Sequence, residues 1–144
     1  MITSKAKVLG EITTMPYGKI LVVDDVEINL LIAKGLLQYY EIKVETAISG
    51  FIAIAKVQEG SVYDIIFMDH MMPYMDGKET VSKLRKMGYV GTIIALTANK
   101  FTGNMEELKE DGFDDFLPKP IEVWELNTLL NKYVHDRYIE NKSL

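Results

Sequence analysis

Short apolar runs alternate with helical stretches from Lys19 onward, and this alternation limits the possible folds more than any other feature of the chain. One run, Ile65 to Met68, is continuously apolar, as expected for a strand buried on both faces. Strands that alternate with helices form βαβ units, whose strands lie parallel in one sheet. The sequence therefore predicts an α/β fold: a doubly wound five-stranded parallel sheet with helices on both faces.

The apolar spacing also places the individual elements. We predict strands over residues 19–23, 42–47, 64–68, 92–96 and 115–117, and helices over residues 27–39, 51–59, 78–87, 104–111 and 122–136. We expect the first helix to pack on the sheet through one apolar face, formed by Ile28, Leu31, Ile32, Leu36 and Leu37. The last helix carries a similar face, formed by Val123, Leu126, Leu129, Leu130, Tyr133 and Val134.

Four of the predicted strands end on polar residues. Asp24 and Asp25 follow the first strand, Asp69 the third, Thr97 the fourth and Lys119 the fifth. The carboxyl ends of parallel strands lie along one edge of a sheet, where ligands bind. Three carboxylates would meet a hydroxyl and an ammonium there, and crowded carboxylates repel one another unless a cation neutralises them. Mg²⁺ favours such carboxylates together with phosphate oxygens, so the pattern predicts a magnesium and phosphate site.

Length, charge and composition set further limits. The 144 residues suit one domain, and the net charge of −5 argues against binding to nucleic acid. The absence of cysteine fits a reducing cytoplasm, and no apolar run approaches the roughly 20 residues that span a bilayer. We expect residues 1–18 to be a lead-in, as a disordered tail or the stub of a linker, residues 19–136 to form the domain, and residues 137–144 to be a tail.

Four segments of the chain resemble the response-regulator receiver domains of two-component signalling. They are Val22-Val23-Asp24-Asp25, Met68-Asp69-His70-Met71-Met72-Pro73-Tyr74-Met75-Asp76-Gly77, Ala95-Leu96-Thr97-Ala98 and Leu117-Pro118-Lys119-Pro120, in the order that the family has. The resemblance extends from about Lys19 to Val134. It implies a flavodoxin-like sheet with strand order 2-1-3-4-5.

The resemblance also implies a role for each strand-end residue. Asp69 would accept the phosphoryl group, since a carboxylate can act as a nucleophile and form an aspartyl phosphate. Asp25, Asp69 and the Met71 backbone carbonyl would bind Mg²⁺ directly, with Asp24 acting largely through water. Thr97 and Lys119 would contact the phosphoryl group, and Phe116 would change rotamer with Thr97. The Lys119–Pro120 bond would be cis.

Each of these residues has a simpler explanation when it is considered alone. Asp69 and the Asp24-Asp25 pair could cap helices or turns, Thr97 could be a strand residue, and Lys119 could be a solvated surface charge. Phe116 is equally explained by core packing. We interpret His70 as an exposed loop histidine that points away from Asp69, and the neighbouring methionines as packing residues.

A receiver would take phosphate from a histidine kinase domain and lose it to water or to a phosphotransfer histidine. It would catalyse its own phosphorylation and dephosphorylation without turning over a free substrate. Asn29, the run from Met68 to Pro73 and the entry Met15 to Lys19 resemble receivers attached to hybrid histidine kinases. We therefore expect a cytoplasmic domain without direct membrane contact, free or tethered to a membrane-bound kinase. A dimer through the face of the fourth and fifth strands and helices would fit the family.

Two other functions are open on the sequence. A small Mg²⁺-dependent phosphatase of the haloacid-dehalogenase type also uses an aspartate nucleophile and a lysine, but its two aspartates lie two residues apart early in the chain, whereas Asp24 and Asp25 are adjacent here. A stand-alone receiver could instead act as a protein-binding module. Turnover of a free phosphomonoester would favour the phosphatase.

Overall fold

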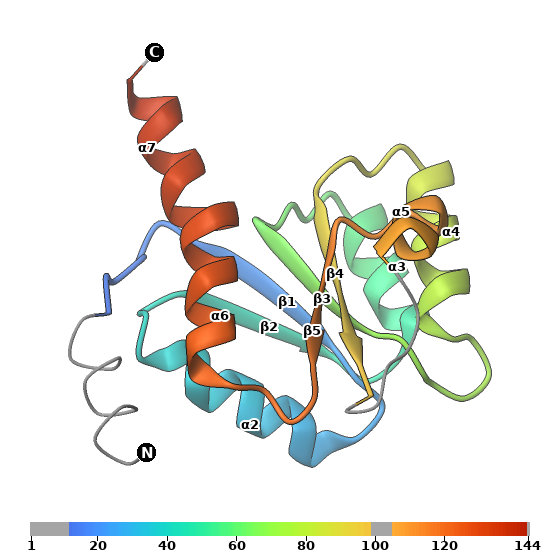
Figure 1. Cartoon of the computed structure of the whole chain (residues 1–144). Coiled ribbons are helices and arrows are strands. Elements are labelled where there is room, and N and C mark those ends of the chain that lie inside the picture. Colours follow the sequence, from blue (N-terminus) through green and yellow to red (C-terminus); the bar gives the residue numbers. More distant parts are fainter. Residues whose placement is uncertain (1–11, 99–104, 144) are drawn as a thin grey trace.

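The computed structural model describes residues 12–98 and 105–143 of the 144-residue chain. Five strands form one parallel sheet in the order β2-β1-β3-β4-β5 (Figure 1). They are β1 (Lys19–Val23), β2 (Lys43–Ala47), β3 (Ile65–Asp69), β4 (Thr92–Thr97) and β5 (Asp115–Pro118). The predicted fold class and strand order are confirmed. No helix in the described part of the chain is long and apolar enough to cross a membrane.

The helices cover both faces of the sheet. They are α2 (Glu27–Gln38), α3 (Gly50–Gln58), α4 (Gly77–Lys86), α5 (Met105–Asp111), α6 (Val123–Leu130) and α7 (Asp136–Lys142), with the π-turn η1 (Asn131–His135) joining the last two. The helices α2 and α6 lie on one face, and α3, α4 and α5 lie on the other (Figure 1). The last helix was predicted to end at residue 136 but continues through η1 and α7 to Lys142.

The alternation of side chains along the buried strands divides the core into two clusters. Ile20 and Val22 of β1 face α2 and α6, whereas Leu21 and Val23 face α3 and α4. Successive side chains of a strand point to opposite faces of the sheet, so a strand covered on both faces must be apolar throughout. This requirement explains the continuous apolar runs in the sequence.

The predicted packing face of α2 is wrong for three of its five residues. Ile28, Leu31 and Ile32 are 58%, 61% and 53% exposed. Instead Leu30 and Ala33 pack on the sheet with the correctly predicted Leu37, while Leu36 is partly buried. Apolar residues cover most of the circumference of this helix, so periodicity alone could not say which side turns inward. The result is an exposed apolar surface on α2.

Part of the predicted lead-in packs against the domain. Met15 is fully buried, and its backbone N–H donates to the carbonyl of Tyr40 over 2.7 Å. The ring of Tyr17 stacks on that of Tyr138 in α7, with centroids 3.6 Å apart, and its hydroxyl lies 2.7 Å from Nδ1 of His135. Residues 1–11 of the predicted lead-in lie outside the described residues. The two ends of the described chain therefore hold each other beside the sheet.

Candidate functional site

The parallel sheet brings the polar strand ends together at one edge, as predicted. Asp69, the last residue of β3, pairs with Leu96 of β4, and Thr97 pairs with Pro118 of β5. Asp24 follows β1, the other neighbour of β3. The carboxyl ends of these strands lie at the lower edge of the sheet in Figure 1, near the start of α2. Each of these candidate side chains is therefore positioned by the end of a strand.

Three carboxylates form an acidic cluster at this edge. Oxygen atoms of Asp24, Asp25 and Asp69 lie within 4.8 Å of one another. Asp24 and Asp69 are buried, at 1% and 3% exposure, and Asp25 is exposed. Burial, and then the nearby charge of Asp24, raises the pKa of Asp69 to about 6, although Lys119 opposes the shift. Two buried carboxylates and an exposed one match the oxygen donors that a divalent cation prefers.

Lys119 lies between the two buried carboxylates. Its Nζ donates to Asp69 Oδ1 over 3.1 Å and lies 3.6 Å from Asp24 Oδ2. The backbone N–H of Lys119 donates to the carbonyl of Thr97 over 2.8 Å, and the bond to Pro120 is cis, as expected. Lys119 is therefore a partly buried ion-pair residue, and the surface-charge explanation is excluded.

The Thr97 hydroxyl has no hydrogen-bond partner in the described part of the chain. The side chain is fully buried, and Oγ1 is the one buried side-chain oxygen or nitrogen without a partner in residues 12–98 and 105–143. A buried hydroxyl that makes no hydrogen bond costs about 1–3 kcal/mol. An acceptor that enters the site would remove this cost.

Two residues that the sequence analysis did not assign to the site support it. The Asn29 amide donates to Asp24 Oδ2 over 3.2 Å from the first turn of α2. At Gly77 any side chain would collide with the carbonyl oxygen of Asp69, so the turn after Asp69 requires glycine. Because Asp76-Gly77 also looks like an ordinary cap and turn, only the folded structure identifies this contact.

The structure also gives the positions of three other residues that the sequence analysis discussed: Phe116, Met71 and His70. Phe116 is 36% exposed and pairs with Ala95, two residues before Thr97, so it is not a core residue. The N–H of Met71 lies 3.3 Å from Asp69 Oδ1, and the Met71 side chain is 70% exposed. His70 is half-buried, with its ring centroid 6.1 Å from that of Phe113. The interpretation of His70 as an exposed residue was therefore wrong.

Comparison with known proteins identifies the family. The response regulator receiver domain family matches residues 20–131, which is more than half of the chain. The chain is a response regulator receiver domain. Its alignment with a hybrid signal transduction histidine kinase of Dictyostelium discoideum is 39% identical over 123 residues. That alignment covers 81% of this chain and 7% of the kinase, so this receiver domain corresponds to a small part of that protein.

Two solved structures share the fold over most of this receiver domain. The receiver domain of the sensor histidine kinase PA1611 from Pseudomonas aeruginosa, with a magnesium ion coordinated in its active-site cleft, is 31% identical, with a TM-score of 0.71 and coverage of 82% of this chain and 98% of that one. The receiver domain of Ssk1 from Saccharomyces cerevisiae, in complex with the histidine phosphotransfer protein Ypd1, is 24% identical, with a TM-score of 0.78 and coverage of 87% and 94%.

Proposed function

We propose that this receiver domain accepts a phosphoryl group on Asp69 from a phosphohistidine, in the presence of Mg²⁺, and then switches conformation or passes the group on. The observation that carries this proposal is the contact of one ammonium, Lys119, with two buried carboxylates, Asp69 and Asp24. In this arrangement a carboxylate nucleophile, a cation site and a phosphoryl-binding ammonium lie within a few ångströms of one another. A mere helix cap or surface lysine would need none of these contacts.

The proposed transfer uses Asp69 as the nucleophile. A carboxylate oxygen of Asp69 forms a bond to phosphorus while the nitrogen–phosphorus bond of the phosphohistidine breaks, and the electron pair returns to the imidazole nitrogen. Asp25, Asp69 and the Met71 carbonyl would hold Mg²⁺, with Asp24 acting largely through water. When bound, the ion neutralises the carboxylates and the charge of the moving phosphoryl group. Lys119, which pairs with Asp69 before transfer, would pair with a phosphoryl oxygen afterwards.

Phosphorylation would change the structure through Thr97. Its buried hydroxyl has no partner among the described residues and would donate to a phosphoryl oxygen on Asp69. Thr97 lies at the end of β4, so this bond would shift that strand end, and Phe116 on the neighbouring strand would change rotamer with it. The phosphorylated and unphosphorylated forms would thus differ in their equilibrium between two arrangements.

The proposed partner is a protein that carries the phosphohistidine. The exposed apolar surface of α2 supports this proposal, since Ile32 belongs both to that surface and to a cavity of about 150 Å³ beside Asp24 and Lys119. An apolar surface that is continuous with the reactive site suits a docked protein better than a free small molecule. The complex of Ypd1 with the Ssk1 receiver domain offers a precedent for such pairing.

We also propose that the domain belongs to a hybrid histidine kinase and lies in the cytoplasm, where it is free or tethered to a membrane-bound kinase. The similarity to the kinase of Dictyostelium discoideum supports this origin. The flanking coding sequence provides the test, because it would encode a histidine kinase core. A dimer through the face of β4, β5 and their helices stays a prediction.

Phosphorylation by a small donor tests the central proposal. Wild-type protein is incubated with phosphoramidate and Mg²⁺, and the intact mass is measured. We expect the mass of one added phosphoryl group, which is absent in Asp69→Asn and after chelation of Mg²⁺. Asp76→Asn is the matched control, since Asp76 is an exposed helix cap whose role asparagine can fill. Unchanged labelling of Asp69→Asn would refute the assignment of Asp69.

A further inference from the structure

The loop between β3 and α4 contains a strained residue at its apex. Tyr74 has a φ of 69°, and the Met75 N–H donates to the Pro73 carbonyl over 2.8 Å across it. This is a γ-turn of the rare type with positive φ, which is strained for a residue other than glycine. Aromatic residues adopt this backbone conformation only at an energetic cost. The surrounding structure must therefore hold Tyr74 in place.

Contacts on both sides of Tyr74 fix the loop. Met75 is 3% exposed, and the Gly77 N–H donates to the His70 carbonyl over 3.2 Å. The carboxylate of Asp76 caps α4 by accepting from the Glu79 N–H over 2.8 Å. These contacts are made by the loop backbone and by its neighbouring side chains, so they hold the backbone without using the Tyr74 side chain.

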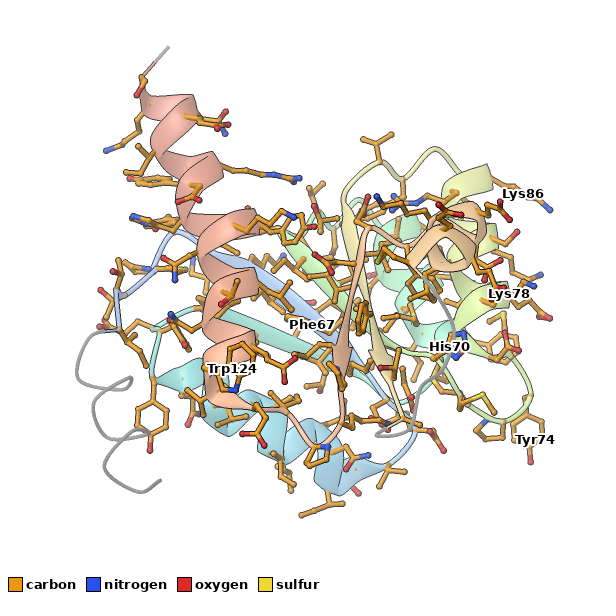
Figure 2. All side chains as sticks on the ribbon, in the orientation of Figure 1. Phe67, His70, Tyr74, Lys78, Lys86 and Trp124 are labelled. Carbon is orange, nitrogen blue, oxygen red and sulfur yellow. The ribbon has the colours of Figure 1, made fainter. Side chains whose placement is uncertain are left out.

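The Tyr74 side chain itself projects into solvent. It is 98% exposed, and Figure 2 shows it pointing away from the sheet at the tip of the loop that follows Asp69. A fully exposed side chain buries no apolar surface in its own domain, so packing of the Tyr74 ring itself does not offset the strain. Met71, in the same loop, is 70% exposed. The acceptor is thus followed by a short loop that displays two large apolar side chains.

We infer that Tyr74 is a recognition residue that packs its ring against the protein that carries the phosphohistidine. This inference rests on the proposed function. Asp69 is only 3% exposed, so a donor histidine must enter the site, and the donor's surface then comes close to the rim. Tyrosine is a frequent anchor of protein interfaces, because its rigid ring buries a large area at a small entropic cost. The donor would offset the strain that the free domain carries.

The test compares two phosphoryl donors. Phosphoramidate reaches Asp69 without a protein surface, whereas phosphorylated Ypd1 presents a phosphohistidine on one. Initial rates of labelling are measured at equal donor concentration for wild type, Tyr74→Asn, Tyr74→Phe and Glu41→Asn. Asparagine accepts positive φ more readily than tyrosine, so Tyr74→Asn removes the ring and relaxes the loop. Glu41, with a φ of 59°, is the matched control, because it lies beside β2 at the opposite edge of the sheet.

We expect Tyr74→Asn to lower the rate from phosphorylated Ypd1 by about tenfold or more, the effect of losing an interface anchor. The rate from phosphoramidate should stay unchanged. Tyr74→Phe keeps the ring and should stay within about twofold of the wild-type rate with both donors. Glu41→Asn should change neither rate. Both asparagine variants should raise the melting temperature by about 2–5 °C, which shows that they fold and that each strain is relieved.

Several outcomes would overturn the inference. One is a labelling rate from phosphorylated Ypd1 that is the same in Tyr74→Asn as in wild type. Another is an equal loss of rate with both donors, which would mean that Tyr74 affects phosphoryl transfer itself and not docking. A loss in Tyr74→Phe as large as in Tyr74→Asn would also contradict a role for the ring. A wild-type rate from phosphorylated Ypd1 no greater than that from phosphoramidate would exclude docking. Failure of phosphoramidate to label the wild type would refute the proposed function itself, which separates the two hypotheses.

Discussion

Polar groups at the two edges of the sheet differ in how well they are paired. At the amino edge, where the strands begin, Arg85 pairs with Asp114 and donates to the carbonyls of Tyr89, Gly91 and Gly112 over 2.8–3.0 Å. At the carboxyl edge, two buried carboxylates share Lys119, and the buried Thr97 hydroxyl has no partner in residues 12–98 and 105–143. The strands are the same, so the difference lies in the residues at their ends.

The strand β4 shows this contrast within six residues. Thr92, at its start, is 3% exposed, and its hydroxyl accepts from Arg137 Nη1 over 2.7 Å. Thr97, at its end, is fully buried with an unpaired hydroxyl. One edge therefore contributes to stability, whereas the other keeps binding groups available at a cost to stability. We expect substitutions at the two edges to change the free energy of unfolding with opposite signs.

The largest effect should come from Arg85→Met at the amino edge. The side chain keeps its apolar stem but loses its charged hydrogen bonds to three carbonyls and to Asp114. We expect the free energy of unfolding to fall by about 2–4 kcal/mol, measured by urea denaturation. Lys86→Met is the control, because Lys86 is exposed on the same helix and should change stability by about 0.5 kcal/mol or less. Equal effects of the two substitutions would contradict the contrast.

Asp69→Asn should have the opposite sign in metal-free protein. The folded pKa of Asp69 is raised from 3.8 to about 6 by burial and by Asp24, so the ionised carboxylate destabilises the native state. We expect a gain of about 1–3 kcal/mol at neutral pH in the presence of a chelator. Because a raised pKa means stability that is lost as pH rises, the gain should develop between 3.8 and about 6 and should be absent at lower pH.

Asp25→Asn provides the comparison for this substitution. Asp25 belongs to the same cluster but is exposed, so removing its charge should change stability by about 0.5 kcal/mol or less. Urea denaturation of both variants across this pH range measures the difference. If Asp69→Asn is less stable than wild type, or if its gain in stability does not depend on pH, the ionised Asp69 carboxylate does not destabilise the native state.

The sequence predicted the sheet well because its signal is local. The run from Ile65 to Met68 can be buried on both faces only as a central strand, and the polar residues after each run then meet at one edge. The buried face of α2 could not be predicted in this way. Ile28, Leu31 and Ile32 follow the same helical spacing as the residues that do pack, and only the tertiary arrangement decides which side is covered.

The site was predicted in the same uneven way. Asp69 and Lys119 could be placed together because both lie where a strand ends, and the structure gives their contact of 3.1 Å. The support from Asn29 and Gly77 depends on the approach of separate elements, for which the sequence has no local signal. The unpaired Thr97 hydroxyl and the strained Tyr74 are also consequences of tertiary structure. Local patterns placed the candidate site residues at one edge of the sheet, but they could not predict the strain in the residues around them.

The paired threonines of β4 give a smaller and sharper test. Thr97→Val replaces an unpaired hydroxyl by a methyl group of similar size, so we expect a gain in stability of about 1 kcal/mol. Thr92→Val removes a satisfied hydroxyl and leaves Arg137 without its acceptor, so we expect a loss of about 1 kcal/mol. Urea denaturation of both variants measures the two signs. The same sign for both would contradict the comparison of the two edges.

The smallest effect should come from Tyr63→Phe, which removes a hydrogen bond between the residues just before β3 and the strand β2. The Tyr63 hydroxyl donates to Glu45 Oε1 over 2.8 Å, and this bond is the main cause that lowers the pKa of Glu45 below 4.5. A lowered pKa means stability that is present above 4.5 and lost as pH falls through the folded value. Because the Glu45 side chain is 35% exposed and solvent screens its charge, the free energy of unfolding of the variant should fall by about 0.5 kcal/mol or less at pH values above 4.5.

Urea denaturation at pH values on both sides of 4.5 measures this effect, and the stability of Tyr63→Phe should depend less on acid than that of wild type. Tyr39 is exposed, so Tyr39→Phe is the control and should show the acid dependence of wild type. An acid dependence in Tyr63→Phe as steep as in wild type would mean that Lys19 and Lys56, which also contact Glu45, hold this carboxylate without the tyrosine.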